Sequence, residues 1–389
     1  MKVFVETEPL LKYPAGIAVY LNRLYGELSA LQKEITLYTG FQGADRQVRA
    51  NWKNAVLQYM PEGTSIVRKI PLPGRLSQWL PCPVKRAVAF KGNDYDLVHF
   101  AANGCPPWVQ FDHFRNAVLT IHDMFPFHEE IPFPRTRLIR HLLDNLPRQA
   151  EQAAAILTVS EFSKKEICRF TGVDPEKIFV TPIATQWQED IQTIPDSTIL
   201  DRLQVKPKTY FFTVSALSVH KNYPVLLEAF ERYKKSSSAG SDDKLLIAGS
   251  RVHGDDELVR KIQMNPHVIL LNNLSREDLL TLYRNAGGTF CLSRIEGFGI
   301  PLLEAMSCGC PACYASGSSM DEIGRDAAWS VSPDDPGQAA EIMALFRSGD
   351  ASLESRIMKQ KEYAREYSWS KTAQQTYQVF QKTVAQTVR

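Results

Sequence analysis

The sequence predicts an α/β protein built from two doubly wound halves. It has 389 residues, which exceeds the length that one ordinary core supports, so about two domains are expected. Short apolar segments alternate with amphipathic helical ones, a pattern typical of mostly parallel sheets. The alternation breaks once, in a polar, proline-containing linker at 186–208. We therefore expect Rossmann-like domains at 1–190 and 207–368, and a helix at 369–389 that packs back on the first domain.

The first half begins with a β-branched and aromatic strand at 2–7, followed by a helix that opens near Gly16. Ile17, Tyr20 and Leu24 in this helix follow helical spacing, as do two later leucines. A capping-box pattern, Ser163 to Glu166, predicts the start of a later helix. The remaining strands are expected at residues 35–38, 97–100, 117–121, 155–159 and 177–181.

The second half repeats the alternation. Helices are expected at 223–233, 275–286, 337–346, 353–366 and 369–384. Strands are expected at 210–214, 244–248, 268–271 and 288–292, with another that ends at residue 331. In both sheets, ligands would bind at the carboxyl ends of the strands. The loops at Gly16, Asn103, His122, Lys221, Arg251 and Glu296 all follow predicted strands, so we expect them to line one cleft between the domains.

The most informative segment is a strand, turn and helix that carries two glutamates eight positions apart, Glu296 and Glu304. Gly297 and Gly299 allow an unusual turn and a close approach to a ligand. Pro301 suits the first turn of a helix, and a helix N-terminus favours an anion such as phosphate. Carboxylates beside such a site indicate sugar or ribose hydroxyls as their partners.

Three other strand ends carry residues suited to the same ligand. Lys221, followed by Asn222, lies between a strand and a helix, where an ammonium group can meet a diphosphate. His122 and Asp123 close a strand, and His122 is expected to bind a sugar hydroxyl or the departing phosphate, with Asp123 orienting it. Gly16 lies at the first strand-to-helix turn, where its amide would meet phosphate or the acceptor. For each of these, a solvated loop or a packed turn is the alternative.

Composition excludes several classes of protein. The chain is 44% hydrophobic and 23% charged, with a net charge of +2, and has no apolar run long enough for a membrane span. Seven cysteines without disulfide-like spacing, and no signal-peptide apolar run, lead us to expect a cytoplasmic protein. Residues 46–92 hold nine basic residues and one acidic residue. This stretch is either a solvated surface or a contact for an anionic acceptor or membrane; no nucleic-acid motif accompanies it.

Motifs for metals and other nucleotide chemistry are weak or missing. Asp94 and Asp96 fit a D-x-D pattern but precede a strand, and the aspartate pair 242–243 is interpreted as a surface pair. Cys308, Cys310 and Cys313 have no nearby histidine or fourth cysteine, so small-residue packing is favoured over zinc. Neither G-x-G-x-x-G nor a P-loop follows a strand, which disfavours a nicotinamide dehydrogenase and a P-loop NTPase. We expect no metal and no cofactor.

The segment from Arg294 to Glu304, continuing to Pro311 and then 319–328, resembles the donor-binding signature of retaining glycosyltransferases of family 4, which have the GT-B fold. The run 217–222, with Lys221, resembles the phosphate segment of that family. Matches at Gly16, 119–123, 159–163 and 282–286 extend the resemblance over nearly the whole chain. His220 stands where the family more often has arginine, and Ser215 and Ala216 where it has glycine and a small polar residue.

The resemblance implies metal-independent transfer of a hexose, with retention, from a nucleotide diphosphate sugar to a glycan or lipid-linked acceptor in polysaccharide biosynthesis. It assigns catalysis to His122, Lys221 and Glu296. Glu304 would bind ribose, Glu296 the sugar, and Lys221 with His220 the diphosphate. The expected donor-binding residues are Gly16, Ser215, His220, Lys221, Gly249, Arg251, Gly297, Phe298, Gly299, Ile300 and Glu304.

The donor is expected to be UDP-glucose or a related UDP-hexose, with GDP-mannose as the alternative. Two other functions remain open at this point. A hydrolase or 2-epimerase on the same scaffold would turn over without an acceptor. A catalytically inactive nucleotide-sugar-binding protein would bind donor without transfer; its support is the departures at Ser215, Ala216 and His220.

Overall fold

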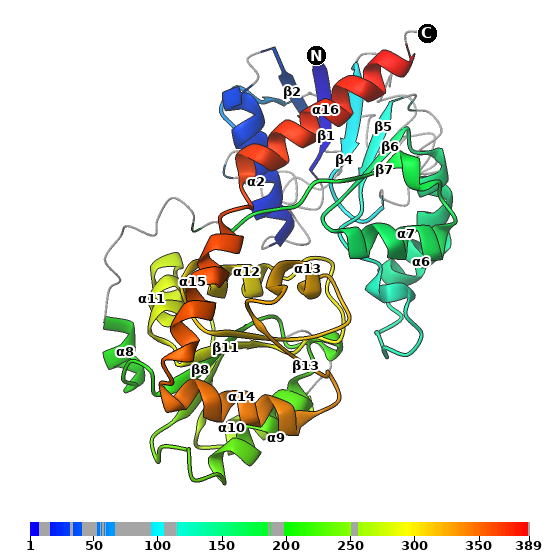
Figure 1. Ribbon diagram of the computed structural model, residues 1–389. Helices are drawn as coiled ribbons and strands as arrows, with labels where there is room; N and C mark the ends of the chain where they lie inside the picture. The colour runs from blue at the N-terminus through cyan, green and yellow to red at the C-terminus, as the bar shows by residue number, and fades with distance from the viewer. Residues whose placement is uncertain are drawn as a thin grey trace, which may run out of the picture. The chain divides into compact units, whose positions relative to one another are not determined.

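The computed structural model forms two compact units (Figure 1). Unit 1 comprises Met1–His128, Pro134–Ile183 and Trp369–Arg389, and unit 2 comprises Glu129–Phe133 and Ala184–Ser368. The sequence places 129–133 in the first domain, whereas this short segment clusters with unit 2. Described residues are 1–7, 16–31, 34–40, 53–54, 56, 58, 60–66, 95–104, 114, 116–185, 187, 198–249 and 256–387.

Unit 1 is organised around a seven-stranded parallel sheet with the order β3-β2-β1-β4-β5-β6-β7. Strands β4, β5 and β6 are buried throughout, as expected for short apolar runs covered on both faces. The order reverses between β1 and β4, which marks a topological switch point. The strands are β1 (Lys2–Glu6), β2 (Thr36–Gly40), β3 (Ser65–Ile66), β4 (Leu97–Phe100), β5 (Ala117–Thr120), β6 (Ala155–Thr158) and β7 (Ile178–Val180).

Helices α2 (Gly16–Leu31) and α16 (Trp369–Thr387) pack against each other on this sheet, and α6 (Arg137–Gln152) packs against α7 (Glu161–Thr171) (Figure 1). The last helix of the chain thus belongs to unit 1, where the Thr372 hydroxyl donates to the Pro182 carbonyl at 2.5 Å. The predicted capping box at Ser163 is wrong. Ser160 is the N-cap of α7, and its hydroxyl accepts from the Ser163 amide, because the helix begins three residues earlier.

Unit 2 has a six-stranded parallel sheet with the order β10-β9-β8-β11-β12-β13. The order reverses between β8 and β11, so a second switch point lies there. The strands are β8 (Tyr210–Val214), β9 (Lys244–Ala248), β10 (Val268–Leu271), β11 (Gly288–Cys291), β12 (Ala312–Ala315) and β13 (Trp329–Val331). The helices are α8 (Thr198–Leu203), α9 (Tyr223–Lys234), α10 (Asp256–Met264), α11 (Arg276–Asn285), α12 (Ile300–Ser307), α13 (Met320–Gly324), α14 (Pro336–Ser348) and α15 (Ser352–Ala364).

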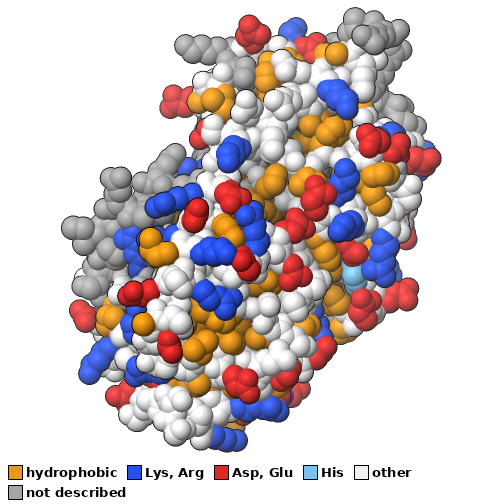
Figure 2. Space-filling model, in the orientation of Figure 1, with side chains coloured by type: hydrophobic (Ala, Val, Ile, Leu, Met, Phe, Trp, Pro, Cys, Tyr) orange, Lys and Arg blue, Asp and Glu red, His pale blue; other side chains and the backbone are white. Residues whose placement is uncertain are grey.

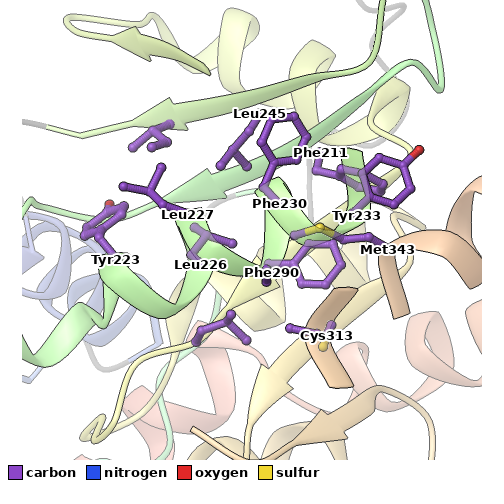
Figure 3. Packing of buried hydrophobic residues seen from close by; sticks show 14 of the residues in the cluster. Phe211, Tyr223, Leu226, Leu227, Phe230, Tyr233, Leu245, Phe290, Cys313 and Met343 are labelled. Atoms are coloured by element: carbon purple, nitrogen blue, oxygen red, sulfur yellow. The ribbon is translucent and has the colours of Figure 1, made fainter. Parts of the chain in front are cut away.

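Aromatic packing fixes helices α9 and α14 on one face of this sheet (Figures 1 and 3). Phe211 of β8 meets Tyr233 and Phe290 edge-on, at centroid distances of 5.1 and 5.5 Å. A Cβ at Gly288 would lie 2.2 Å from the Phe346 ring, so the glycine permits this approach of α14. Helices α11, α12, α13 and α15 cover the other face (Figure 1).

Two further sequence interpretations need correction. The predicted linker contains α8, and Trp187 within it is fully buried. Asp243 is not a surface residue: it is buried and accepts hydrogen bonds from Tyr233 at 2.5 Å and Arg347 at 3.1 Å. A buried carboxylate needs such partners, and Arg347 lies 104 positions away, beyond the reach of any local pattern.

Charges of both signs are interspersed on the face seen in Figure 2. None of the described helices has the length and apolarity to cross a membrane.

Candidate active site

A pocket in unit 2 lies where the strands β8 and β11 end, at the switch point of the sheet. Thr213 and Val214 line it from β8, and Cys291 and Leu292 from the end of β11. Its polar lining comes from Ser215, Lys221, Ser293 and Glu296. The fold therefore brings together two strand ends whose loops were singled out from the sequence.

Lys221 and Glu296 form an ion pair in this pocket, with Nζ 2.5 Å from Oε1. Both side chains are largely buried, at 15% and 16% exposure. Burial alone raises the pKa of Glu296, but the Lys221 charge and hydrogen bonds hold it below its usual value. The glutamate is thus a carboxylate, with an ammonium group beside it. Asn222, in the left-handed region at φ 57°, ends the turn that presents Lys221, and its side chain donates to the Pro333 carbonyl.

The hydroxyl of Ser319 stabilises the Gly297–Phe298–Gly299 turn. The Ser319 hydroxyl contacts the carbonyls of Glu296 and Phe298 at 2.8 and 2.9 Å. Gly299 is the N-cap of α12 at φ 106°, a conformation that other residues rarely adopt. Ile300 and Pro301 begin the helix, and the Leu302 and Leu303 amides donate to the Gly299 carbonyl at 3.0 and 3.2 Å. The turn therefore ends in a helix N-terminus suited to an anion.

His220 is neutral at physiological pH. Burial, and then the nearby Lys221 charge, lowers its pKa to about 4, against the opposing effect of Glu296. Phe133 stacks on the imidazole at 5.4 Å, and Nδ1 lies 3.0 Å from the Ser218 hydroxyl. The sequence-based role for His220, shared stabilisation of a diphosphate, therefore reduces to hydrogen bonding without positive charge.

Ser215 has both its donors engaged within unit 2. Its amide donates to the Ala248 carbonyl at 2.9 Å. The Tyr223 hydroxyl donates to the Ser215 carbonyl at 2.8 Å, so the Ser215 hydroxyl must donate in the 2.7 Å contact with Tyr223. Only acceptor oxygens remain for a ligand. Gly249 supports this arrangement, because a Cβ there would lie 1.9 Å from the Ser215 carbonyl oxygen.

Glu304 lies on α12, buried, where it accepts a hydrogen bond from Tyr283 at 3.1 Å. Burial raises its pKa to about 7, against the opposing effects of Tyr283, Trp187 and Arg276. The carboxyl group therefore changes charge near neutral pH. Trp187 comes from the predicted linker, and the Arg276 guanidinium lies 5.3 Å from its ring. The two glutamates therefore differ in pKa: burial raises that of Glu304, whereas the Lys221 charge holds that of Glu296 below its usual value.

His122 of unit 1 follows β5 and is held through its backbone and its ring. Its amide donates to Asn103 Oδ1 at 2.7 Å, and its carbonyl accepts from the Ser163 hydroxyl at 3.2 Å. Nε2 lies 3.1 Å from the Ala101 carbonyl, which can only accept, so Nε2 carries the proton. Burial lowers the pKa of His122, which leaves the ring neutral and Nδ1 as an acceptor. Asn103 also donates to Asp123 Oδ1 at 3.1 Å.

The remaining predicted residues divide into three groups. Gly16 is the exposed first residue of α2 in unit 1, and a Cβ added there would meet nothing within 4 Å. Arg251 and Asp94 lie outside the described residues. Asp96 accepts from the Lys2 amide at 2.7 Å, as a structural residue at the start of β4 would. Within the described ranges, no three His, Cys, Asp or Glu side chains gather as metal ligands would.

The sequence places the Asn103 loop at the site without giving Asn103 a role, and it does not assign the other supporting residues to the site. Asn103 and Ser163 hold the His122 backbone, Ser319 holds the glycine turn, and Phe133 covers His220. Ser163 and Ser319 both lie in segments that carry the family resemblance, which is the one signal that could have indicated them. No sequence pattern indicates the contact of Phe133 with His220. It arises because Glu129–Phe133 belong to unit 2, whereas the chain on either side belongs to unit 1.

Two family descriptions match this chain and together cover most of it. Glycosyl transferases group 1 matches residues 198–367, and Glycosyltransferase Family 4 matches residues 14–184. The two matches fall on the two sheets that carry the site residues described above. Two doubly wound parallel sheets of this order define the GT-B fold. The chain belongs to the family 4, group 1 glycosyltransferases.

Two curated mannosyltransferases align over nearly the full length. O-antigen chain mannosyltransferase B of Escherichia coli is 27% identical over 391 residues, covering 98% of this chain and 99% of the relative. MMP alpha-(1->4)-mannosyltransferase of Mycolicibacterium hassiacum is 23% identical, covering 95% of each. Among solved structures, Anabaena Alr3699/HepE in complex with UDP and glucose superposes with a TM-score of 0.73 at 16% identity, covering 98% of this chain and 100% of the other.

Proposed function

We propose that this glycosyltransferase transfers mannose from GDP-mannose to a glycan or lipid-linked saccharide in the synthesis of a bacterial polysaccharide. The full-length similarity to an O-antigen mannosyltransferase supports the sugar and the pathway. UDP-hexose, the donor first expected from the sequence, has support from solved structures at 13–16% identity, and such a similarity shows the fold alone. GDP-mannose, the sequence-based alternative, is therefore the donor that we favour.

The observation that carries the proposal is the Lys221–Glu296 pair in the pocket at the switch point. A carboxylate beside an ammonium group matches a sugar diphosphate, which presents hydroxyl donors next to phosphate oxygens. In this proposal Glu296 accepts from sugar hydroxyls, and Lys221 stabilises the charge that grows on the departing diphosphate. The amides of Gly297, Phe298, Gly299 and Ile300 at the start of α12 add positive dipoles to the same site.

Glu304 is proposed to accept hydrogen bonds from the ribose, which its deprotonated form does best. Neutral His220 donates a hydrogen bond to a phosphate oxygen from Nε2 when Nδ1 accepts from Ser218. The neutral His122 presents Nδ1 as an acceptor, which suits a substrate hydroxyl better than an anionic phosphate. Of the two partners proposed for His122 from the sequence, we therefore favour the hydroxyl.

We propose a retaining, metal-independent reaction. The bond from the anomeric carbon to the diphosphate breaks, and the acceptor oxygen forms its bond on the same face. The acceptor hydroxyl proton passes to the departing phosphate oxygen. Charge stabilisation of the leaving group is the main contribution that Lys221 and the α12 N-terminus make in this scheme.

Donor choice is tested by thermal unfolding with GDP, UDP, ADP, GDP-mannose and UDP-glucose in the absence of added metal. The cognate donor should stabilise by ~2.7 kcal/mol at a hundredfold excess over its Kd. We expect GDP-mannose to give the largest shift and UDP-glucose a small one; the reverse order would restore the UDP-hexose prediction. If no nucleotide shifts the midpoint, the donor site is wrong.

Catalysis is tested with the donor that binds and a panel of mannosylated and lipid-linked acceptors. Transfer with retention at the anomeric carbon, lost in Lys221→Ala, supports the proposal. Donor turnover without acceptor would indicate the epimerase or hydrolase alternative, and tight binding without transfer to any acceptor the inactive binding protein. The basic stretch 46–92 lies mostly outside the described residues, so membrane association stays a prediction, tested by co-sedimentation with anionic vesicles.

A further inference from the structure

A chain of buried polar groups in unit 1 ends beside His122. Tyr25 Oη lies 2.5 Å from His99 Nδ1, and His99 Nε2 lies 2.7 Å from Thr120 Oγ1. Thr120 Oγ1 lies 3.3 Å from Tyr20 Oη. All four side chains are buried, with at most 3% exposure. The function proposed above uses none of them.

The tyrosine at the end of this chain touches the His122 ring. The two ring centroids are 4.9 Å apart and the rings are perpendicular, the favoured edge-to-face geometry. Tyr20 thereby occupies space that the imidazole would need in order to rotate. Such a rotation would break the contact between His122 Nε2 and the Ala101 carbonyl, which fixes the tautomer.

The two hydrogen bonds of His99 depend on each other. Burial lowers the pKa of His99 to about 3, so this imidazole is neutral and has one N–H. One nitrogen therefore donates while the other accepts, so the tautomer of His99 couples its bond with Tyr25 to its bond with Thr120. Removing any member leaves a buried polar group without its partner, which is unfavourable. A chain of this kind restricts the Tyr20 ring more than apolar packing alone would.

Helix α16 closes the arrangement from the other end of the sequence. Phe380 meets His99 edge-on at 5.4 Å, and Trp369 lies 6.2 Å from Tyr20. The network thus joins residues from α2, β4, β5 and α16, all within unit 1. Four elements converge on the placement of one tyrosine ring.

We propose that Tyr20 is a positioning residue that holds His122 as the Nε2–H tautomer, and that Thr120, His99 and Tyr25 in turn hold Tyr20. The catalytic consequence rests on the proposed function, in which His122 Nδ1 accepts from a substrate hydroxyl. A flipped or mixed tautomer would present a donor where an acceptor is required. The tautomer itself does not depend on that function.

The tautomer is read by nitrogen NMR of protein labelled at histidine, with the His122 signals assigned by their loss in His122→Gln. Tyr20→Leu removes the ring, and Thr120→Val removes the hydrogen bonds while leaving both rings. We expect a single Nε2–H form in the wild type and a mixture of tautomers in both variants. Tyr20→Phe keeps the ring but loses the hydroxyl, so its share of the Nε2–H tautomer should lie between those of the wild type and Tyr20→Leu. An Nε2–H signal unchanged in Tyr20→Leu and Thr120→Val overturns the proposal.

Tyr38→Phe is the matched control, because Tyr38 lies on β2 of the same unit and packs on Tyr95, at 5.2 Å, rather than on the network. It should leave the His122 signals and the transfer rate unchanged. In Tyr20→Leu, kcat should fall about tenfold or more while KM for the donor changes little, because orientation is lost and the proposed nucleotide contacts lie in unit 2. A mixed tautomer with unchanged kcat would support the positioning and count against the catalytic role of His122.

Discussion

Lys221 and Glu296, 75 positions apart in the sequence, meet at 2.5 Å between Nζ and Oε1. The contact joins the loop after β8 to the loop after β11 across the switch point of unit 2. The Lys221 charge lowers the pKa of the largely buried Glu296, so the ligand meets a preformed pair of opposite charges. A donor that engages both must replace this bond with its own phosphate and hydroxyl groups.

Breaking the pair should cost stability as well as activity. Lys221→Met leaves a largely buried carboxylate and Glu296→Gln leaves an ammonium group, and each should lower the free energy of unfolding by roughly 3 kcal/mol. The double variant should lose less than the sum, as urea unfolding will measure. Each should abolish most transfer. Arg232→Met, which breaks the exposed pair with Glu228, is the control and should cost under about 1 kcal/mol. Additive losses in the double variant would mean that the pair is not coupled.

Glu304 should make the free energy of unfolding fall as pH rises, the reverse of the usual effect of a paired carboxylate. Its folded pKa, about 7, lies above the unfolded value, so its contribution is complete at low pH and is lost as pH rises from about 4.5 to 7. Glu304→Gln should therefore gain stability relative to the wild type across this window, by at most about 3 kcal/mol. Thermal unfolding at pH 4.5 and 8 measures the difference. A difference that is the same at both pH values would contradict the raised pKa.

His220 should make the free energy of unfolding change with pH in the opposite direction, over much of the same pH range. Its folded pKa, about 4, lies below the unfolded value, so stability is lost as pH falls from about 6.5 to 4. His220→Gln should be relatively more stable at pH 4 than at pH 7. Phe133→Leu opens the stacked face and should shift the His220 titration upward, measured by NMR. If that titration stays in place, Phe133 does not contribute to the burial of His220.

Two glycines should respond differently to alanine. Gly249→Ala places a Cβ against the Ser215 carbonyl and should cost about 3 kcal/mol, since a backbone atom cannot move aside cheaply. Gly16→Ala meets open space and should change the free energy of unfolding by under about 0.5 kcal/mol. If Gly16→Ala nevertheless lowers the transfer rate, the function of Gly16 is to let the substrate approach the backbone closely. Equal stability of the two variants would contradict the packing at Gly249.

Much of the fold follows from local pattern, while the support of the site does not. Apolar runs such as 244–248 predict buried parallel strands because both faces of these sheets are covered. The boundary errors have specific causes: Ser160 rather than Ser163 caps α7, and α8 is too short to show periodicity. Glu296 and Lys221 were predicted together from motif and resemblance. Their pairing, the neutral state of His220 and the buried Asp243 depend on contacts between distant segments, which no local pattern encodes.

Helix α16 has a consequence for synthesis. Domains generally fold as units while the chain emerges from the ribosome, the N-terminal one first. Here Trp369 and Phe380 complete the packing around Tyr20 and His99, so unit 1 cannot finish folding until α16 has been made. Unit 2, encoded between the two parts, is free to fold earlier. The half of the protein that is translated first is therefore the half that matures last.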